Sequence, residues 1–214
     1  MSSKNQEKIT RIRVSKFKNK YDIEPFLRKN RDKNYSISGS LDVYGRPETS
    51  PLENTISISK DLSIYGSTIK SLGKLKSVGG RLMLVETDIM SLGNLETIGG
   101  DFTMIDFKIS SLESLGNLKS VGGSMNLSYA PIKSLGKLTS VGDYLDLEGS
   151  SVESFGDLTS VGGDLYLFGT PLLEKYTEEE IRKIVRVSGN IFTEDQRDHE
   201  VSYDDETGVS ISIY

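Results

Sequence analysis

The sequence contains no cysteine and a single histidine in 214 residues. Without cysteine the chain can form no disulfide, no thiolate metal site and no cysteine nucleophile. No run of apolar residues approaches the roughly 18 that a membrane-spanning helix needs. The charged start, MSSKNQEKITRIRVSK, also lacks the apolar stretch of a secretory signal. We therefore expect a cytoplasmic protein without a membrane segment.

The residues needed for catalysis are equally scarce. His199 lies in the polar stretch TEDQRDHEVSY, whereas a nucleophile–base–acid set needs a base placed beside its nucleophile. Two acidic runs near it lack the ligand spacing of an EF-hand calcium loop. They are Asp195, Asp198 and Glu200, and Asp204, Asp205 and Glu206. The sequence therefore predicts no enzyme activity, no catalytic residue, no cofactor and no metal site.

Charge is distributed unevenly along the chain. Residues 1–34 hold eleven Lys and Arg against four Asp and Glu, a net charge of +7, which leaves −12 for the remainder. A basic lobe on an acidic body is either a solvated cap or an arm that binds an acidic partner or nucleic acid. In the nucleic-acid alternative, the phosphate contacts come from Arg11, Arg13, Lys16 and Lys18.

The chain repeats one pattern of about twenty residues, as in SLGKLTSVGDYLDLEGSSVE and SFGDLTSVGGDLYLFGTPLL. Counted from the first residue of each expected strand, apolar side chains fall at positions 1, 3, 8, 11, 14 and 17. In one copy these are Leu82, Leu84, Ile89, Leu92, Leu95 and Ile98. The copy that begins at Phe102 contains a three-residue insertion near SSLE. A fixed period of this length is typical of a solenoid, in which each coil packs on its neighbours.

The pattern also predicts the kind of coil. Alternation at positions 1 and 3 indicates a short strand with two side chains inward and the intervening one outward. We expect about seven such strands to form one parallel sheet. Glycine pairs just before each strand are expected to supply a positive φ at a tight corner; they are Gly79/Gly80, Gly99/Gly100, Gly122/Gly123 and Gly162/Gly163.

Both ends of the repeat region are expected to be capped. Thr177 and Glu180 form a capping box, which predicts a short helix from about Glu178. The final EVSYDDETGVSISIY reads as a hairpin, while KITRIRVSK and DIEPFLRKN read as a strand and a helical turn. The expected division is a basic N-terminal cap over residues 1–36, a solenoid over 37–173 and a C-terminal cap over 174–214.

The order Leu-x-Leu-x-x-Thr-x-Ile-x-x-Leu-Gly-x-Leu, over about residues 37–192, resembles the leucine-rich repeat, especially its short bacterial type. SVGGDLYLFGT is also similar to the repeats of receptor L domains. The resemblance implies a right-handed β-solenoid that recognises proteins. Cysteine-free repeat chains of this type also resemble those found in bacterial and large-phage genomes. The fold class expected is mainly β: a leucine-rich-repeat-like solenoid with a short C-terminal helix and a hairpin cap.

Strand alternation predicts which side chains face outward from the sheet. An apolar stripe is expected on the first four strands, comprising Tyr44, Tyr65, Met83, Val85 and Ile105. Charged residues surround it, with Asp61, Arg81 and Asp101 expected to set the register of a partner. Exposed apolar surface with a charged rim is typical of interfaces. The sequence thus predicts a protein-binding module, acting as an adaptor or inhibitor of its partner.

The sequence is also compatible with two further alternatives. Acidic and aromatic side chains near the C-terminal end of the sheet suit carbohydrate binding or hydrolysis. They are Tyr144, Asp146, Glu148, Asp164, Tyr166 and Phe168. The opposite charges of the two ends also suit head-to-tail self-assembly, and two sheet faces could pair as a homo-oligomer.

Overall fold

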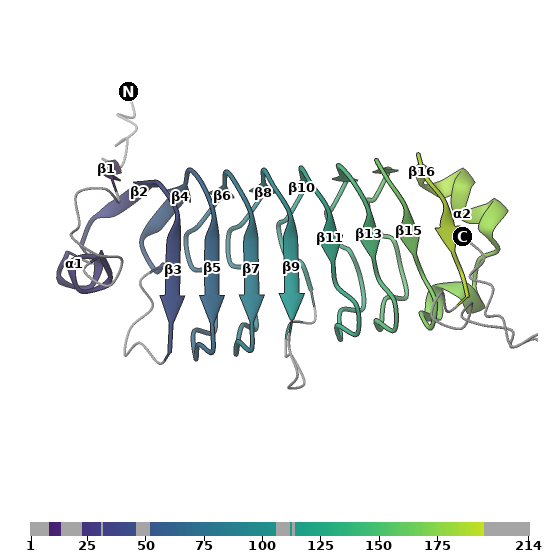
Figure 1. Ribbon diagram of the computed structural model, residues 1–214, viewed down its shortest axis with the longest axis horizontal. Helices are drawn as coiled ribbons and strands as arrows, with labels where there is room; N and C mark the ends of the chain where they lie inside the picture. Colours follow the sequence, from purple (N-terminus) through teal and green to yellow (C-terminus); the bar gives the residue numbers. More distant parts are fainter. Residues whose placement is uncertain are drawn as a thin grey trace, which may run out of the picture.

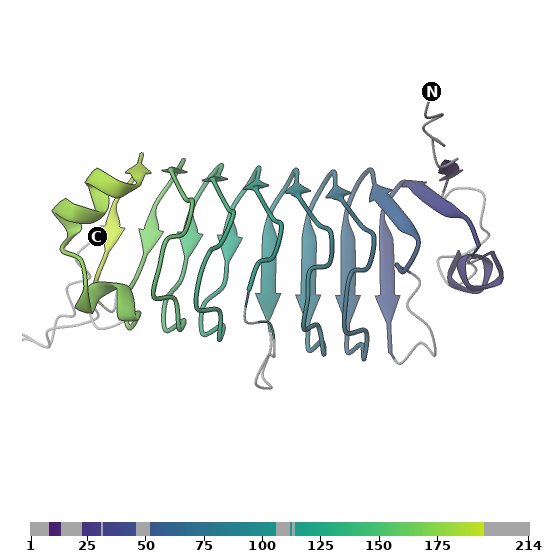
Figure 2. The ribbon, with the colours of Figure 1, turned by 180° about the vertical axis from the view of Figure 1, so that it is seen from behind.

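The computed structural model describes residues 9–13, 23–30, 32–45, 52–105, 112 and 114–194. The chain winds into an elongated β-solenoid whose coils stack along one axis (Figure 1). Figure 2 shows the same stack from behind, with α1 (Ile23–Lys29) at one end and α2 (Glu178–Ile184) at the other. The prediction of a mainly β solenoid is confirmed.

Two parallel sheets run along the solenoid. Sheet A contains β1 (Ile9–Arg13), β2 (Asn34–Ser38), β4 (Thr55–Ile58), β6 (Ser77–Val78), β8 (Thr97–Ile98), β10 (Ser120–Val121), β12 (Ser140–Val141), β14 (Ser160–Val161) and β16 (Arg186–Val187). Sheet B contains β3 (Leu41–Tyr44), β5 (Leu62–Tyr65), β7 (Leu82–Val85), β9 (Phe102–Ile105), β11 (Met125–Asn126), β13 (Leu145–Asp146), β15 (Leu165–Tyr166) and β17 (Ile191–Phe192). Sheet B is the one the alternation predicts, with eight strands rather than about seven. The second parallel sheet, sheet A, was not part of the prediction.

The strands of neighbouring coils pair in the register of the repeat. Leu62 pairs with Leu82, and Leu82 with Phe102, each twenty residues further on. Phe102 pairs with Met125, twenty-three residues on, which confirms the three-residue insertion. Equivalent side chains therefore lie one above another in columns, spaced by roughly 4.8 Å as in any parallel ladder.

The six apolar positions of a coil form the core. In the coil that begins with Leu82, all six side chains are at most 1% exposed. Burial of one such side chain is worth roughly 1.5–3 kcal/mol. Since each coil shares this core with its neighbours, the apolar columns hold the stack together.

The glycine pairs have a role different from the expected one. None of the paired glycines has a positive φ, nor does Gly142, which takes the first position of the pair in a copy that reads Gly142-Asp143. Positive φ occurs instead in two other columns, one that contains Gly136 and one that contains Gly66. A Cβ at Gly142 would overlap the carbonyl oxygen of Gly122 in the preceding coil. Close stacking of backbones, rather than an unusual backbone angle, requires glycine there.

The C-terminal end of the stack is covered by the segment that follows the last repeat. Thr177 and Glu180 form the expected capping box at the start of α2, and Ile181 and Val185 of this segment are buried in the core. A 3-10 helix (Pro171–Glu174) precedes α2. Sheets A and B both continue past residue 173 through β16 and β17. The expected hairpin lies outside the described residues, and the domain boundaries stay a prediction.

Candidate functional site

The outer face of sheet B consists of two columns of side chains. Because the strands pair in register, Tyr44, Tyr65, Val85 and Ile105 lie in line across β3, β5, β7 and β9. The second column continues over all eight strands: Asp42, Ser63, Met83, Thr103, Asn126, Asp146, Tyr166 and Phe192. The apolar stripe expected from the sequence is therefore one continuous surface.

The stripe is ordered by contacts between its own members. The rings of Tyr44 and Tyr65 stack with centroids 5.2 Å apart and an interplanar angle of 11°. The Tyr65 hydroxyl donates to the Met83 sulfur at 3.3 Å. Tyr44 and Ile105 at the two ends are 42% and 41% exposed, whereas the three members between them are half-buried. The rings of Tyr44 and Tyr65 and the thioether of Met83 are thus ordered by contacts within the chain.

The expected rim residues also have a structural role. The Asp61 carboxylate accepts a hydrogen bond from the Arg81 backbone N–H at 2.8 Å, and Asp101 accepts one from Ser124 at 3.0 Å. Asp164 accepts from Asn190 in the same way at 2.8 Å. Each carboxylate therefore binds the backbone of the next coil. Arg81 and Asp101 form an exposed ion pair at 3.7 Å, a type of contact worth at most about 1 kcal/mol.

Beyond Ile105 the face becomes polar. The Asn126 side-chain amide donates to Asp146 at 3.1 Å, and the Tyr129 hydroxyl donates to Glu148 at 2.8 Å. Tyr129 was missed by sequence reasoning, because only the packing of adjacent coils places it beside Glu148. These polar contacts separate the apolar stripe from a second aromatic group.

That aromatic group lies at the C-terminal end of sheet B. Tyr166 stacks on Phe192 with centroids 4.7 Å apart and meets Tyr144 edge-on at 6.3 Å. Phe192 was also missed in the sequence, although its pairing with Tyr166 continues the column. Of the residues in the carbohydrate alternative, the structure brings together Tyr144, Asp146, Glu148 and Tyr166, whereas the Asp164 carboxylate is engaged by the backbone of Asn190.

The half-buried carboxyl of Asp146 leads to a pH prediction. Burial raises its pKa above the ordinary 3.8, and the charge of Glu148 adds to the rise, while the hydrogen bond from the Glu148 backbone N–H lowers it. The folded state then binds this proton more tightly than the unfolded state. Stability is therefore lost as the pH rises from near 3.8 through the folded pKa. We expect Asp146→Asn to gain stability relative to wild type over that range.

Urea denaturation at a series of pH values between 3 and 7 measures this effect. The exposed Asp157 serves as a matched control, because Asp157→Asn removes the same charge without removing a half-buried carboxyl. Parallel stability profiles for wild type and Asp146→Asn would contradict the prediction, whatever constant offset the lost hydrogen bond introduces.

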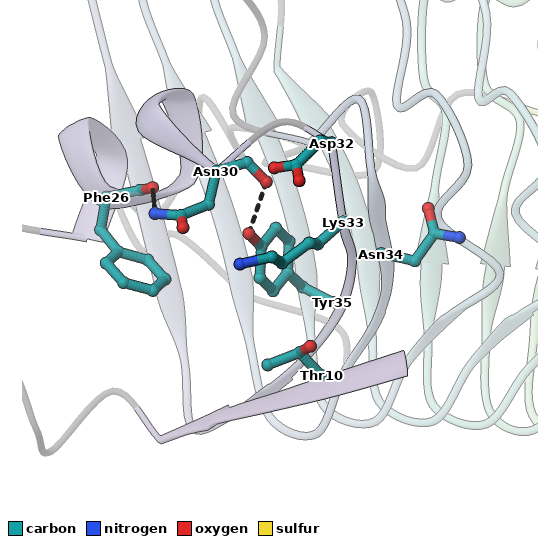
Figure 3. A pocket seen from close by; sticks show the side chains of 7 residues that line it. All are labelled: Thr10, Phe26, Asn30, Asp32, Lys33, Asn34 and Tyr35. Atoms are coloured by element: carbon teal, nitrogen blue, oxygen red, sulfur yellow. Dashed lines mark hydrogen bonds between the residues drawn. The ribbon is translucent and has the colours of Figure 1, made fainter. Parts of the chain in front are cut away.

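A cavity of about 500 Å³ lies in the N-terminal cap rather than on the sheet face (Figure 3). Phe26 of α1 stands on one side of it, and Tyr35 of β2 on the other. The Tyr35 hydroxyl donates to the Asn30 carbonyl. Burial, and secondarily the charge of Asp32, raise the pKa of Tyr35. The phenol is thus a neutral donor that ties β2 to the end of α1.

The other candidate residues from the sequence lie partly within and partly outside the described ranges. Arg11 and Arg13 are exposed on β1, whereas Lys16, Lys18, His199 and the two acidic runs lie outside the described residues. Within the described ranges, no three His, Cys, Asp or Glu side chains come together as metal ligands. Neither helix in those ranges has the length and apolarity to cross a membrane. The chain matches no protein-family model, no curated protein and no solved structure.

Proposed function

We propose that this protein is a non-enzymatic, leucine-rich-repeat-like module of the cytoplasm that binds another protein through the apolar stripe, as an adaptor or inhibitor. The observation that supports this most is the in-register placement of apolar and aromatic side chains on four adjacent outward strand positions. Repeat folds serve many functions, so the proposal rests on this surface rather than on the fold.

The stripe has the properties of an interface centre. Tyrosine and methionine are enriched in interface cores, and tyrosine is among the residues whose truncation weakens binding most. The stacking of Tyr44 on Tyr65 fixes both rings in advance, which lowers the entropy lost on association. Four strands at about 4.8 Å span roughly 14 Å. The surface therefore suits an apolar segment of a partner protein, with Arg81 and Asp101 at its edge.

The experiment is affinity capture from lysate with wild type, Tyr65→Asp and Tyr144→Asp, followed by binary binding of each purified candidate. Tyr144 is a matched control because it is exposed near the same sheet, away from the stripe. A true partner is retained by Tyr144→Asp and lost by Tyr65→Asp. We expect its dissociation constant to rise at least about 30-fold on Tyr65→Asp, the effect of losing roughly 2 kcal/mol at an interface centre.

Light scattering on the three proteins separates this result from self-association. A wild-type dimer that Tyr65→Asp converts to a monomer would identify the partner as a second copy of this chain. Candidates that bind wild type and Tyr65→Asp equally well would refute the role of the stripe. The melting temperature of each variant verifies that folding is intact.

A further inference from the structure

A second cavity, of about 280 Å³, lies on the opposite sheet, where β1 forms the edge of sheet A. It is lined by Arg11, Arg13, Ser36, Ile37, Ser38, Ser57 and Ser59. Arg11 pairs with Ser36 in register, and Arg13 with Ser38. Since alternate residues of a strand face the same side, both guanidinium groups stand on the outer face, with buried Ile12 between them pointing inward.

The lining consists almost wholly of hydrogen-bond donors. Ser57 donates to the Ser36 hydroxyl at 2.8 Å, and Ser59 accepts from the Gly39 backbone N–H at 3.0 Å, so the hydroxyl of Ser59 keeps its own proton for another acceptor. None of the lining residues named is acidic. Among the described residues, no carboxylate forms an ion pair with Arg11 or Arg13.

We infer that this cavity binds the phosphate monoester group of a small molecule. Guanidinium groups bind phosphate oxygens through paired hydrogen bonds, and two of them balance the charge of a monoester near −2 at neutral pH. A phosphodiester has one negative charge and extends in two directions. The volume lies at the lower limit for small-molecule sites, which fits a phosphate with a compact substituent.

The pair of arginines on β1 distinguishes this cavity from the rest of the outer face of sheet A. Outward hydroxyls recur along the sheet at Ser77, Thr97, Ser120, Ser140 and Ser160. At the far end Arg186 pairs with Ser160, which gives one arginine beside a serine but not two arginines on one strand. Arg186 therefore provides a matched control for general electrostatic attraction.

The experiment is calorimetric titration of the full chain with two probes, inorganic phosphate and adenosine 5′-monophosphate, with adenosine as the uncharged control. We expect both phosphates to bind the wild type and adenosine not to bind. Arg11→Gln/Arg13→Gln should weaken binding at least about 30-fold, because charge-assisted hydrogen bonds to phosphate are lost at both arginines. Arg186→Gln should change it less than about twofold. Both side chains are exposed, so melting temperatures are expected to match.

The pH dependence tests the charge of the ligand. The lining residues named include no histidine, aspartate or glutamate. A monoester with a second pKa near 6 loses about three quarters of its dianion between pH 7.5 and 5.5. Affinity for adenosine monophosphate should therefore fall about fourfold over that range, whereas affinity for a diester should not change.

Three results would overturn the inference. One is no heat of binding with either phosphate at millimolar concentration. Another is an equal loss of affinity in Arg186→Gln and the double variant, which would indicate non-specific attraction. The last is binding of a (dT)8 oligonucleotide without terminal phosphates that is tighter than that of the monophosphate and lost in the double variant. That result would assign the site to a nucleic-acid backbone. All three outcomes are independent of the sheet B variants.

Discussion

Gly142→Ala is expected to lower the free energy of unfolding by about 3 kcal/mol or more, at the upper end of the range for overpacked sites. The added Cβ would overlap the carbonyl oxygen of Gly122 and approach its carbonyl carbon to 2.7 Å. These are backbone atoms, and they also belong to a ladder in which Gly142 N–H donates to the Val121 carbonyl. The overlap can therefore be removed only if two coils separate, because no side chain can rotate to make room.

The matched control is Gly66→Ala. Gly66 has a positive φ of 53°, and a Cβ there meets nothing within 4 Å. Its expected loss is about 1–2 kcal/mol, from the left-handed backbone alone. Urea denaturation with a shared m-value measures both changes. A loss at Gly142 no greater than that at Gly66 would show that the neighbouring coils accommodate the added Cβ, and that close stacking does not require glycine there.

Phe102→Ala is expected to lower the free energy of unfolding by about 3–5 kcal/mol, as for large aromatic residues removed from a core. Phe102 is 0% exposed and lies in the column between Leu82 and Met125. It begins the coil with the three-residue insertion. The strand spacing across this coil is set by the ladders on both sides, so the neighbouring coils cannot close on the vacated volume.

Phe102→Leu separates loss of volume from loss of the aromatic ring. Leucine occupies the equivalent position in the two preceding coils, as Leu62 and Leu82. Exchange of one hydrophobic residue for another of similar size typically costs less than about 1.5 kcal/mol of stability. Thermal and urea unfolding of the two variants give the comparison. A loss in Phe102→Ala no greater than that in Phe102→Leu would mean that this coil does collapse around the missing side chain.

Sheet B and strand β1 were predictable, whereas the two-residue strands of sheet A were not, for a reason visible in their residues. A strand such as β7 buries Leu82 and Leu84 on either side of Met83, which gives period-two alternation. A strand such as β12 has two residues, with only Val141 buried, which is too short to show any period. Its identity as a strand depends on hydrogen bonds to residues twenty positions away. Likewise, glycine is required at position 142 because of the backbone of Gly122 in the preceding coil. The residues next to Gly142 in the sequence do not indicate this requirement.

The candidate functional surfaces likewise contain features that the sequence predicts and features that depend on contacts between coils. The outward position of the apolar stripe follows from alternation alone, and the structure places its members as expected. The contact of Tyr129 with Glu148 depends on the packing of adjacent coils. The cavity beside Arg11 depends on the pairing of β1 with β2, two strands that are separated by twenty residues outside the repeat. Basic composition left open whether this lobe is a solvated cap or an arm for an acidic partner or nucleic acid, and it did not indicate which hydroxyls lie beside the two arginines.

Because neighbouring coils pair in a register of twenty residues, such a protein can evolve by gaining whole coils. A tandem duplication of one coil in the gene would add a unit whose two sides already match the units above and below. The molecule would lengthen by about 4.8 Å, while the existing coils kept their contacts. Inward columns constrain each new copy, but outward positions such as those of Tyr65 and Glu148 are free to diverge. Length and recognition surface can therefore be altered separately, by copying and by substitution.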